Sequence, residues 1–316
     1  MSQYQNHRIL ILNGTKTINE YVSVADIYIH FNRYTKILRK LHEHTSIPFK
    51  EVWYGEWKQR IKNYDVFIIF DALREKDIIT YIHKINPAAR IIIYYINKIK
   101  LNAKNDPKNF MGLPCDLWSF DKGDCEKMQM RFNPFCYDDI LVNEESRQAI
   151  NNNENTVEIY DAFFIGVDKN RFPTLVELNN LLKKYGYKTM IIVRRDRNKK
   201  YQSLSGDESI ILTNNTMEYK DVIKLIQQSK AIIEIQVKGQ KGLTLRAMES
   251  LFFKKKLITD NLDILNYDFY KKENIFLLGH DSEKWLETFM LSPYEPVNDD
   301  IVHQYTWESW LERFFK

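Results

Sequence analysis

The feature that most constrains the fold of this chain is a series of short, continuous apolar runs. They recur through its 316 residues and alternate with segments of helical periodicity; the runs are 8–12, 65–71, 89–96, 117–121, 160–166, 189–193, 209–213, 231–235 and 256–259. A strand that is covered by helices on both faces is apolar throughout, whereas a strand with one wet face alternates. The pattern therefore predicts an α/β fold built on parallel sheets.

The spacing of apolar residues predicts helices over 74–85, 175–185, 221–230 and 245–253, and residues 24–44 have mixed helical periodicity. A polar, asparagine-rich stretch at 138–156 is typical of a linker. Since the chain is long enough for two domains, we expect domains at 1–145 and 156–300. The last segment, 301–316, carries Trp307, Trp310 and Phe314 on one side of an expected helix. That aromatic side would pack on another part of the protein or, alternatively, lie on a membrane surface.

One stretch, from Gly239 to Phe253, has the pattern of a glycine loop followed by a helix. Thr244 is placed to cap the helix, and the first N–H groups of a helix attract anions because they lack intrahelical partners. Arg246 in the first turn would add a charge-assisted contact. Glu249, one turn further on, would accept hydrogen bonds from ribose hydroxyls. The alternative is an ordinary buried helix whose loop glycines serve only the turn.

The residues from Glu249 to Thr259 resemble the Glu-Ala-Met-Ala-x-Gly-x-Pro-Val-Ile segment of GT-B glycosyltransferases. Gln240 to Arg246 is similar to the Gln-x-Gly-Leu-Thr-x-Arg pattern of small bacterial polysaccharide and lipopolysaccharide transferases. The resemblance implies two Rossmann-like domains that face a cleft, with the acceptor on the first domain and the nucleotide sugar on the second. It also implies a last helix that crosses back to the first domain. Lys241 stands where the retaining branch often has a second Glu, so the stereochemical outcome stays open.

The site residues expected to bind the nucleotide sugar come from several loops of the second domain. They are Gly166, Arg171, Arg194, Thr213, Tyr219, Gln240, Gly242, Leu243, Thr244, Arg246 and Glu249. For the arginines outside the motif, the alternative is a solvated loop charge. A general base for an inverting transfer is expected from Asp26 and His30 in the first domain, one helical turn apart. The alternative for that pair is ordinary helix surface.

Composition and short motifs limit the kinds of partner, metal and compartment that we expect for this protein. The net charge of +4 is too mild to indicate nucleic-acid binding. No two aspartates lie two residues apart, so the Asp-x-Asp metal motif is absent, and we expect no metal and no cofactor beyond a UDP- or GDP-linked sugar as co-substrate. Three cysteines without metal spacing favour a reducing cytoplasm. The polar N-terminus and the lack of a run of about 18 apolar residues indicate no signal peptide or membrane span.

Together with these observations, the resemblance to GT-B transferases implies a bacterial, cytoplasmic glycosyltransferase that acts on a glycan or glycolipid acceptor of surface-polysaccharide synthesis, with peripheral association at the inner membrane. Two alternatives remain open: a nucleotide-sugar 2-epimerase of the same fold, and a non-catalytic module that binds nucleotide sugars. A dehydrogenase is disfavoured because no Gly-x-Gly-x-x-Gly follows a strand.

Overall fold

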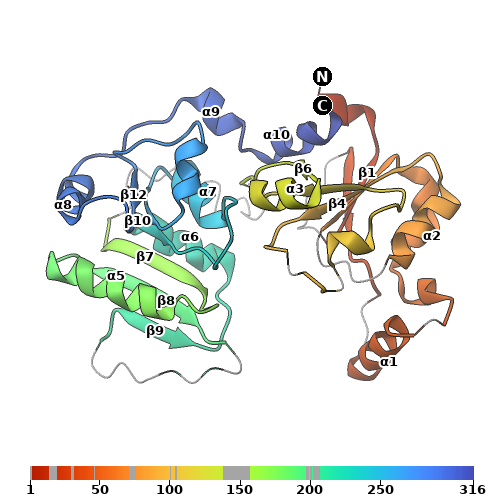
Figure 1. Ribbon diagram of the computed structural model, residues 1–316, viewed down its shortest axis with the longest axis horizontal. Helices are drawn as coiled ribbons and strands as arrows, with labels where there is room; N and C mark the ends of the chain where they lie inside the picture. The colour runs from red at the N-terminus through yellow and green to blue at the C-terminus, as the bar shows by residue number, and fades with distance from the viewer. Residues whose placement is uncertain are drawn as a thin grey trace. The chain divides into compact units, whose positions relative to one another are not determined.

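A computed structural model describes residues 2–13, 20–29, 32–45, 47–70, 76–99, 101–103, 105–137, 157–196, 199, 201 and 207–316. The chain forms two compact units (Figure 1). Unit 1 comprises Met1–Pro134 and Leu311–Lys316, and unit 2 comprises Phe135–Trp310. The predicted linker, 138–156, lies outside the described residues, and so do the domain limits predicted at 145 and 156.

Within the described part of unit 1, one parallel sheet has the strand order β2-β1-β3-β4-β5-β6. The strands are β1 (Ile9–Leu12), β2 (Val22–Ala25), β3 (Val66–Phe70), β4 (Arg90–Tyr95), β5 (Asp116–Ser119) and β6 (Arg131–Phe132). The inner strands β1, β3 and β4 are buried almost throughout, as their continuous apolar runs predicted.

The helices of unit 1 are α1 (Arg33–Glu43), α2 (Asp77–Ile85) and α3 (Lys122–Met128), with short 3-10 helices η1 (Gln3–Asn6), η2 (Lys50–Trp53), η3 (Glu56–Asn63) and η4 (Pro107–Asn109). Helix α2 buries Ile78, Ile79 and Ile82 in a core that also takes Trp57 and Ile61 from η3. Helix α1 contributes no buried residue, and in Figure 1 it lies at the margin of its unit.

The end of the chain completes unit 1. Helix α10 (Trp307–Glu312) leads into η8 (Arg313–Phe315), and the division between the units falls inside α10. The Phe314 ring is buried and packs edge-on against Trp118, with ring centroids 4.9 Å apart, and against Tyr94 at 5.8 Å. The Glu312 carboxylate accepts hydrogen bonds from the backbone N–H groups of Gln3 and Tyr4. The last residues are therefore tied to the first residues and to the sheet of unit 1.

Within the described part of unit 2, a second parallel sheet has the order β12-β11-β10-β7-β8-β9. The strands are β7 (Tyr160–Val167), β8 (Thr189–Arg194), β9 (Ile210–Thr213), β10 (Ser229–Glu234), β11 (Lys256–Thr259) and β12 (Ile275–Leu277). Counted within the unit, this is the doubly wound order 6-5-4-1-2-3. The order of the strands reverses between β7 and β10, which are neighbours in the sheet.

Helices cover both faces of this sheet. They are α5 (Phe172–Lys184), α6 (Tyr219–Gln227), α7 (Leu245–Phe252), α8 (Glu283–Leu291) and α9 (Asp299–His303), with the 3-10 helix η7 (Leu262–Asn266). Alternate residues of one strand enter different cores: Phe163 packs with α6 and α7, whereas Phe164 packs with α5 and α8. Burial on both faces explains why the strands contain no regular polar alternation.

The structure confirms the predicted α/β class and parallel sheets, and it corrects one local prediction. Residues 24–44 do not form one helical segment, because β2 ends at Ala25 and α1 begins only at Arg33. The side-chain amide oxygen of Asn32 caps α1 by accepting from the N–H groups of Tyr34 and Thr35. Strands β2, β6 and β12 and helices α3, α8 and α9 carry no prediction. None of the helices in the described ranges is both long enough and apolar enough to cross a membrane.

Candidate functional site

The carboxyl ends of β7 and β10 form the point at which ligands bind in open α/β sheets of this topology. Asp168 follows β7, Gln236 follows β10 and Asp260 follows β11. The chain from Ile235 to Leu243 then forms a loop that leads into helix α7. The predicted glycine loop thus lies where the strand order of the sheet reverses, which is called the switch point below.

Helix α7 begins with a cap that is itself anchored to the sheet. The Thr244 hydroxyl oxygen accepts a hydrogen bond from the Arg246 N–H at 3.1 Å, and the same hydroxyl donates to Glu234 at the end of β10. The second oxygen of Glu234 accepts from the Thr259 hydroxyl at 2.7 Å. Glu234 is buried, and burial raises the pKa of its carboxyl group. The free N–H groups of the first turn are therefore held at a fixed position above the sheet.

The loop before α7 is constrained at several points. Gly239 has φ +82°, in the left-handed region that favours glycine. The Gln236 N–H donates to Asp260 Oδ1 at 2.7 Å, and its side-chain amide donates to the Gly242 carbonyl at 3.2 Å. Two buried polar atoms at this edge, Gln236 Oε1 and Asn261 Nδ2, have no hydrogen-bond partner among the described residues. Buried polar atoms without a partner are rare in folded proteins, so these two call for an explanation, of which a bound polar group is one.

Arg171 links the two central strands rather than extending toward solvent. Its guanidinium donates to the carbonyls of Val167, Asp168 and Ile235, which lie at the ends of β7 and β10. Gly166 makes this placement possible, because a Cβ there would lie 2.9 Å from an Arg171 nitrogen. Burial lowers the pKa of Arg171 from its ordinary value. The predicted contact of Arg171 with a phosphate can therefore use only the guanidinium N–H groups that do not already donate to these three carbonyls.

Glu249 belongs to a buried polar cluster on α6 and α7. Its carboxylate accepts from the Tyr219 hydroxyl at 3.0 Å and forms an ion pair with Arg246. The Tyr219 oxygen lies 3.4 Å from the Tyr137 hydroxyl. Burial raises the pKa of Glu249 to about 7, although the Arg246 charge opposes this rise. Three predicted site residues, Tyr219, Arg246 and Glu249, are thus brought together from two helices.

Arg194 and Thr213 lie on the other side of β7 from the loop. The Arg194 guanidinium donates to the Thr216 hydroxyl at 2.7 Å, and the Thr213 hydroxyl oxygen accepts from the Asn215 N–H at 3.0 Å. Both residues are at the carboxyl ends of their strands, β8 and β9. Gln240 closes a turn of the loop through its N–H and the Val237 carbonyl, and Leu243 is fully buried.

Two buried acidic residues of this edge carried no site prediction. Glu234 is one; its sequence signal is a carboxylate inside an otherwise apolar run. Asp168 is the other. It is buried, and its Oδ2 accepts from Lys199 Nζ at 2.6 Å and from the Tyr201 hydroxyl at 2.8 Å. Burial opposes the ionisation of Asp168, but these hydrogen bonds hold its pKa below the ordinary value.

The predicted catalytic pair in unit 1 does not have the expected local structure. Asp26 is exposed and follows β2 in a non-helical segment, so the helical spacing assumed for Asp26 and His30 is wrong over residues 26–29. His30 lies outside the described residues.

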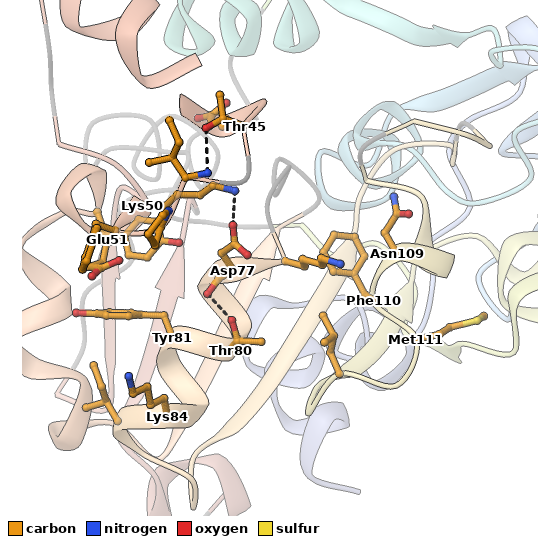
Figure 2. A pocket seen from close by; sticks show the side chains of 18 of the residues that line it. Thr45, Lys50, Glu51, Asp77, Thr80, Tyr81, Lys84, Asn109, Phe110 and Met111 are labelled. Carbon is orange, nitrogen blue, oxygen red and sulfur yellow. Dashed lines mark hydrogen bonds and ion pairs between the residues drawn. The ribbon is translucent and has the colours of Figure 1, made fainter. Parts of the chain in front are cut away.

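Unit 1 contains a hollow of about 1330 Å³ between η2, α2 and η4 (Figure 2). Two tyrosine rings, Tyr54 and Tyr81, contribute to its wall, with centroids 5.4 Å apart. Its lysines are Lys50, Lys76, Lys84 and Lys108, and the Lys50 ammonium pairs with Asp77. Among the residues that the structure describes, no group of three or more His, Cys, Asp and Glu side chains is arranged to hold a metal ion.

No protein-family model matches the chain, and no curated protein matches it. Solved structures are similar to it, and three of them are described here. A sucrose-phosphate synthase from Thermosynechococcus elongatus has a TM-score of 0.54 at 10% identity, with 98% of this chain and 87% of that chain covered. A UDP-forming trehalose-phosphate synthase from Burkholderia xenovorans has a TM-score of 0.52 at 11% identity, with 98% of each chain covered. A glycosyltransferase from Rickettsia africae has a TM-score of 0.52 at 10% identity, with 97% and 88% covered. These similarities confirm the predicted GT-B fold.

Proposed function

We propose that the protein is a glycosyltransferase that moves a sugar from a UDP- or GDP-linked donor to a lipid-linked or surface-polysaccharide acceptor. The observation that carries the proposal is the anchored N-terminus of α7 at the switch point of the unit 2 sheet. In glycosyl transfer, negative charge grows on the departing nucleotide diphosphate. Backbone N–H groups that are fixed before the reaction stabilise that charge without reorganisation.

Arg246 and Glu249 are proposed to exchange partners when the donor binds. In the structure their side chains neutralise each other, and the Glu249 side chain is fully buried. A diphosphate at the start of α7 would draw the Arg246 guanidinium into a charge-assisted contact. The Glu249 carboxylate would then be available to ribose hydroxyls, with Tyr219 holding its other oxygen. Gln236 and Asn261, with their unsatisfied polar atoms, are placed to complete the polar wall.

The acceptor is proposed to bind unit 1. Its hollow combines tyrosine rings, which suit a sugar ring or a lipid segment, with lysines, which suit a phosphate. A lipid-linked acceptor places the reaction at the cytoplasmic face of the inner membrane, so we also propose peripheral membrane association and a cytoplasmic, bacterial setting. No metal is required, since α7 and Arg246 supply the positive potential.

The proposal is tested first by nucleotide binding. We expect UDP or GDP, but not CMP or NAD, to raise the melting temperature by mass action, and isothermal titration to give the same preference. Arg246→Gln should weaken that binding by about tenfold or more, since a charge-assisted contact is worth roughly 1.5–3 kcal/mol. Lys224→Gln is the matched control: Lys224 also forms an i,i+3 ion pair in unit 2, but on the exposed side of α6.

Catalysis is tested next. The binding nucleotide, linked to different sugars, should release nucleotide diphosphate in the presence of extracts of bacterial glycolipids. A shift with NAD alone would refute the proposal. Binding of UDP or GDP without release, or with interconversion of the free nucleotide sugar, would assign the site to a non-catalytic module or to an epimerase.

A further inference from the structure

Helix α1 exposes its apolar side. Tyr34, Ile37, Leu38 and Leu41 have exposed fractions of 77%, 50%, 56% and 61%. Their spacing of three and four residues places them on one stripe of the helix. An amphipathic helix of a globular unit normally turns such a stripe toward the core. Contiguous exposed apolar surface of this kind marks an interaction site.

The polar side of α1 is the side that contacts the rest of unit 1. The Arg39 guanidinium lies over the Tyr28 ring, 3.8 Å from its centroid, and also pairs with Glu43. The Trp53 indole N–H donates to His42 Nδ1 at 2.8 Å. These contacts fix the rotation of the helix about its axis, so the outward direction of the apolar stripe is built into the fold.

The apolar surface continues past the end of α1. Ile47 and Phe49 are exposed, and both contribute to the rim of the unit 1 hollow. The α1 stripe, together with Ile47 and Phe49, is called the docking face below. A molecule that enters the hollow from this side would first cross the apolar docking face.

The exposed charged residues of α1, beside the apolar stripe, have one sign. Arg33, Lys36 and Lys40 are exposed on α1. The one acidic residue of α1 is Glu43, whose side chain is 4% exposed and is paired with Arg39. Long basic side chains beside an apolar stripe can reach lipid headgroups while the stripe enters the acyl boundary. A positive border is complementary to an anionic bilayer, which favours lipid over a protein groove as the occupant.

We propose that the docking face binds unit 1 to an anionic membrane surface, with α1 lying in the plane of the interface. This inference deepens the peripheral association proposed above and names the segment and the lipid charge that produce it. It directs the hollow beside Ile47 and Phe49 toward the bilayer from which a lipid-linked acceptor would come.

Flotation of the full chain with vesicles tests the inference. We expect binding to vesicles of phosphatidylglycerol and phosphatidylcholine, weak binding to phosphatidylcholine alone, and loss of the difference at high salt. Leu38→Glu/Leu41→Glu should lower partition by at least about tenfold, because each leucine loses the burial that binding provides. Lys36→Gln/Lys40→Gln should lower partition roughly fivefold per lysine, only on the anionic vesicles.

Leu101→Glu is the matched control, since Leu101 is a leucine of unit 1 with a similar exposed fraction of 59%, outside the docking face. Equal flotation of the wild type and the Leu38→Glu/Leu41→Glu variant would overturn the inference. A dimer that this variant dissociates, without vesicle binding by the wild type, would also overturn it and assign α1 to self-association. Melting shifts with UDP and GDP, measured on the same samples, report separately on the nucleotide-sugar proposal.

Discussion

The pH dependence of stability at Glu249 gives a quantitative test of the α6–α7 cluster. Burial raises the pKa of this carboxyl group from 4.5 to about 7. The folded protein therefore binds the proton more tightly than the unfolded chain does. The resulting stabilisation is complete below pH 4.5 and is lost as the pH rises through 7. At 1.36 kcal/mol per pH unit, the loss amounts to about 3 kcal/mol.

Glu249→Gln removes this titration while it keeps the size of the side chain. We expect the free energy of unfolding of the wild type, relative to the variant, to fall by about 3 kcal/mol between pH 4.5 and 7 and to level off above that. The Arg246 ion pair exists only while Glu249 is ionised, so its effect is already contained in the Glu249 pKa; other differences in the packing of the glutamine add an offset that is independent of pH. The slope, not the offset, is therefore the diagnostic quantity.

The assay is urea unfolding followed by tryptophan fluorescence at several pH values from 4.5 to 8.5. Glu287→Gln, which removes an exposed carboxylate on α8, is the control. A ¹³C titration of the glutamate carboxyl groups gives the pKa directly, since the Glu249 signal is missing in the variant. Parallel stability curves for the wild type and Glu249→Gln, or a carboxyl that titrates near its ordinary value, would refute the reasoning.

Three further changes test other parts of the structure. Thr244→Ala removes the α7 cap and a partner of Glu234, so it should cost about 1–2 kcal/mol of stability and weaken nucleotide binding. Asn298→Ala, at the cap of α9, is the control and should lower stability alone. Equal losses of nucleotide binding by the two variants in thermal-shift titrations would contradict this. Phe314→Ala should lower the free energy of unfolding by about 3–5 kcal/mol in urea melts, because the ring is buried against Trp118; a change below 1 kcal/mol would contradict its core position. Burial lowers the pKa of Lys256 from 10.5 to about 8, so the folded state releases the proton at a lower pH than the unfolded chain does. The wild type should therefore gain stability, relative to Lys256→Met, as the pH rises from 8 to 10.5. A difference in melting temperature between the two proteins that does not change with pH would contradict this.

Most strands and helices were predictable from local sequence. The runs at 65–71, 89–96 and 189–193 have continuous apolar interiors because both faces of their strands are buried, and that signal needs no knowledge of neighbouring strands. Strand β2 was missed because it is a short edge strand whose residues are only partly buried after Val22. An edge position depends on strand order, which a local window does not contain.

The site was predictable in its backbone and not in its side-chain partners. The glycine loop and the Thr244 cap follow from residue types at adjacent positions. The contacts of Arg171 with Ile235, and of Tyr219 with Glu249, join residues that are 64 and 30 positions apart. Those partners are decided by which strands and helices become neighbours in the sheet.

The sequence by itself determined the α/β class, the parallel sheets and the loop that leads into α7, because each rests on local patterns of burial, glycine and capping. Only the tertiary structure decided that Arg171 binds strand ends, that Arg246 and Glu249 neutralise each other, and that α1 turns its apolar stripe outward. A helical pattern specifies that an apolar face exists, but the contacts of Arg39 and His42 decide where that face points.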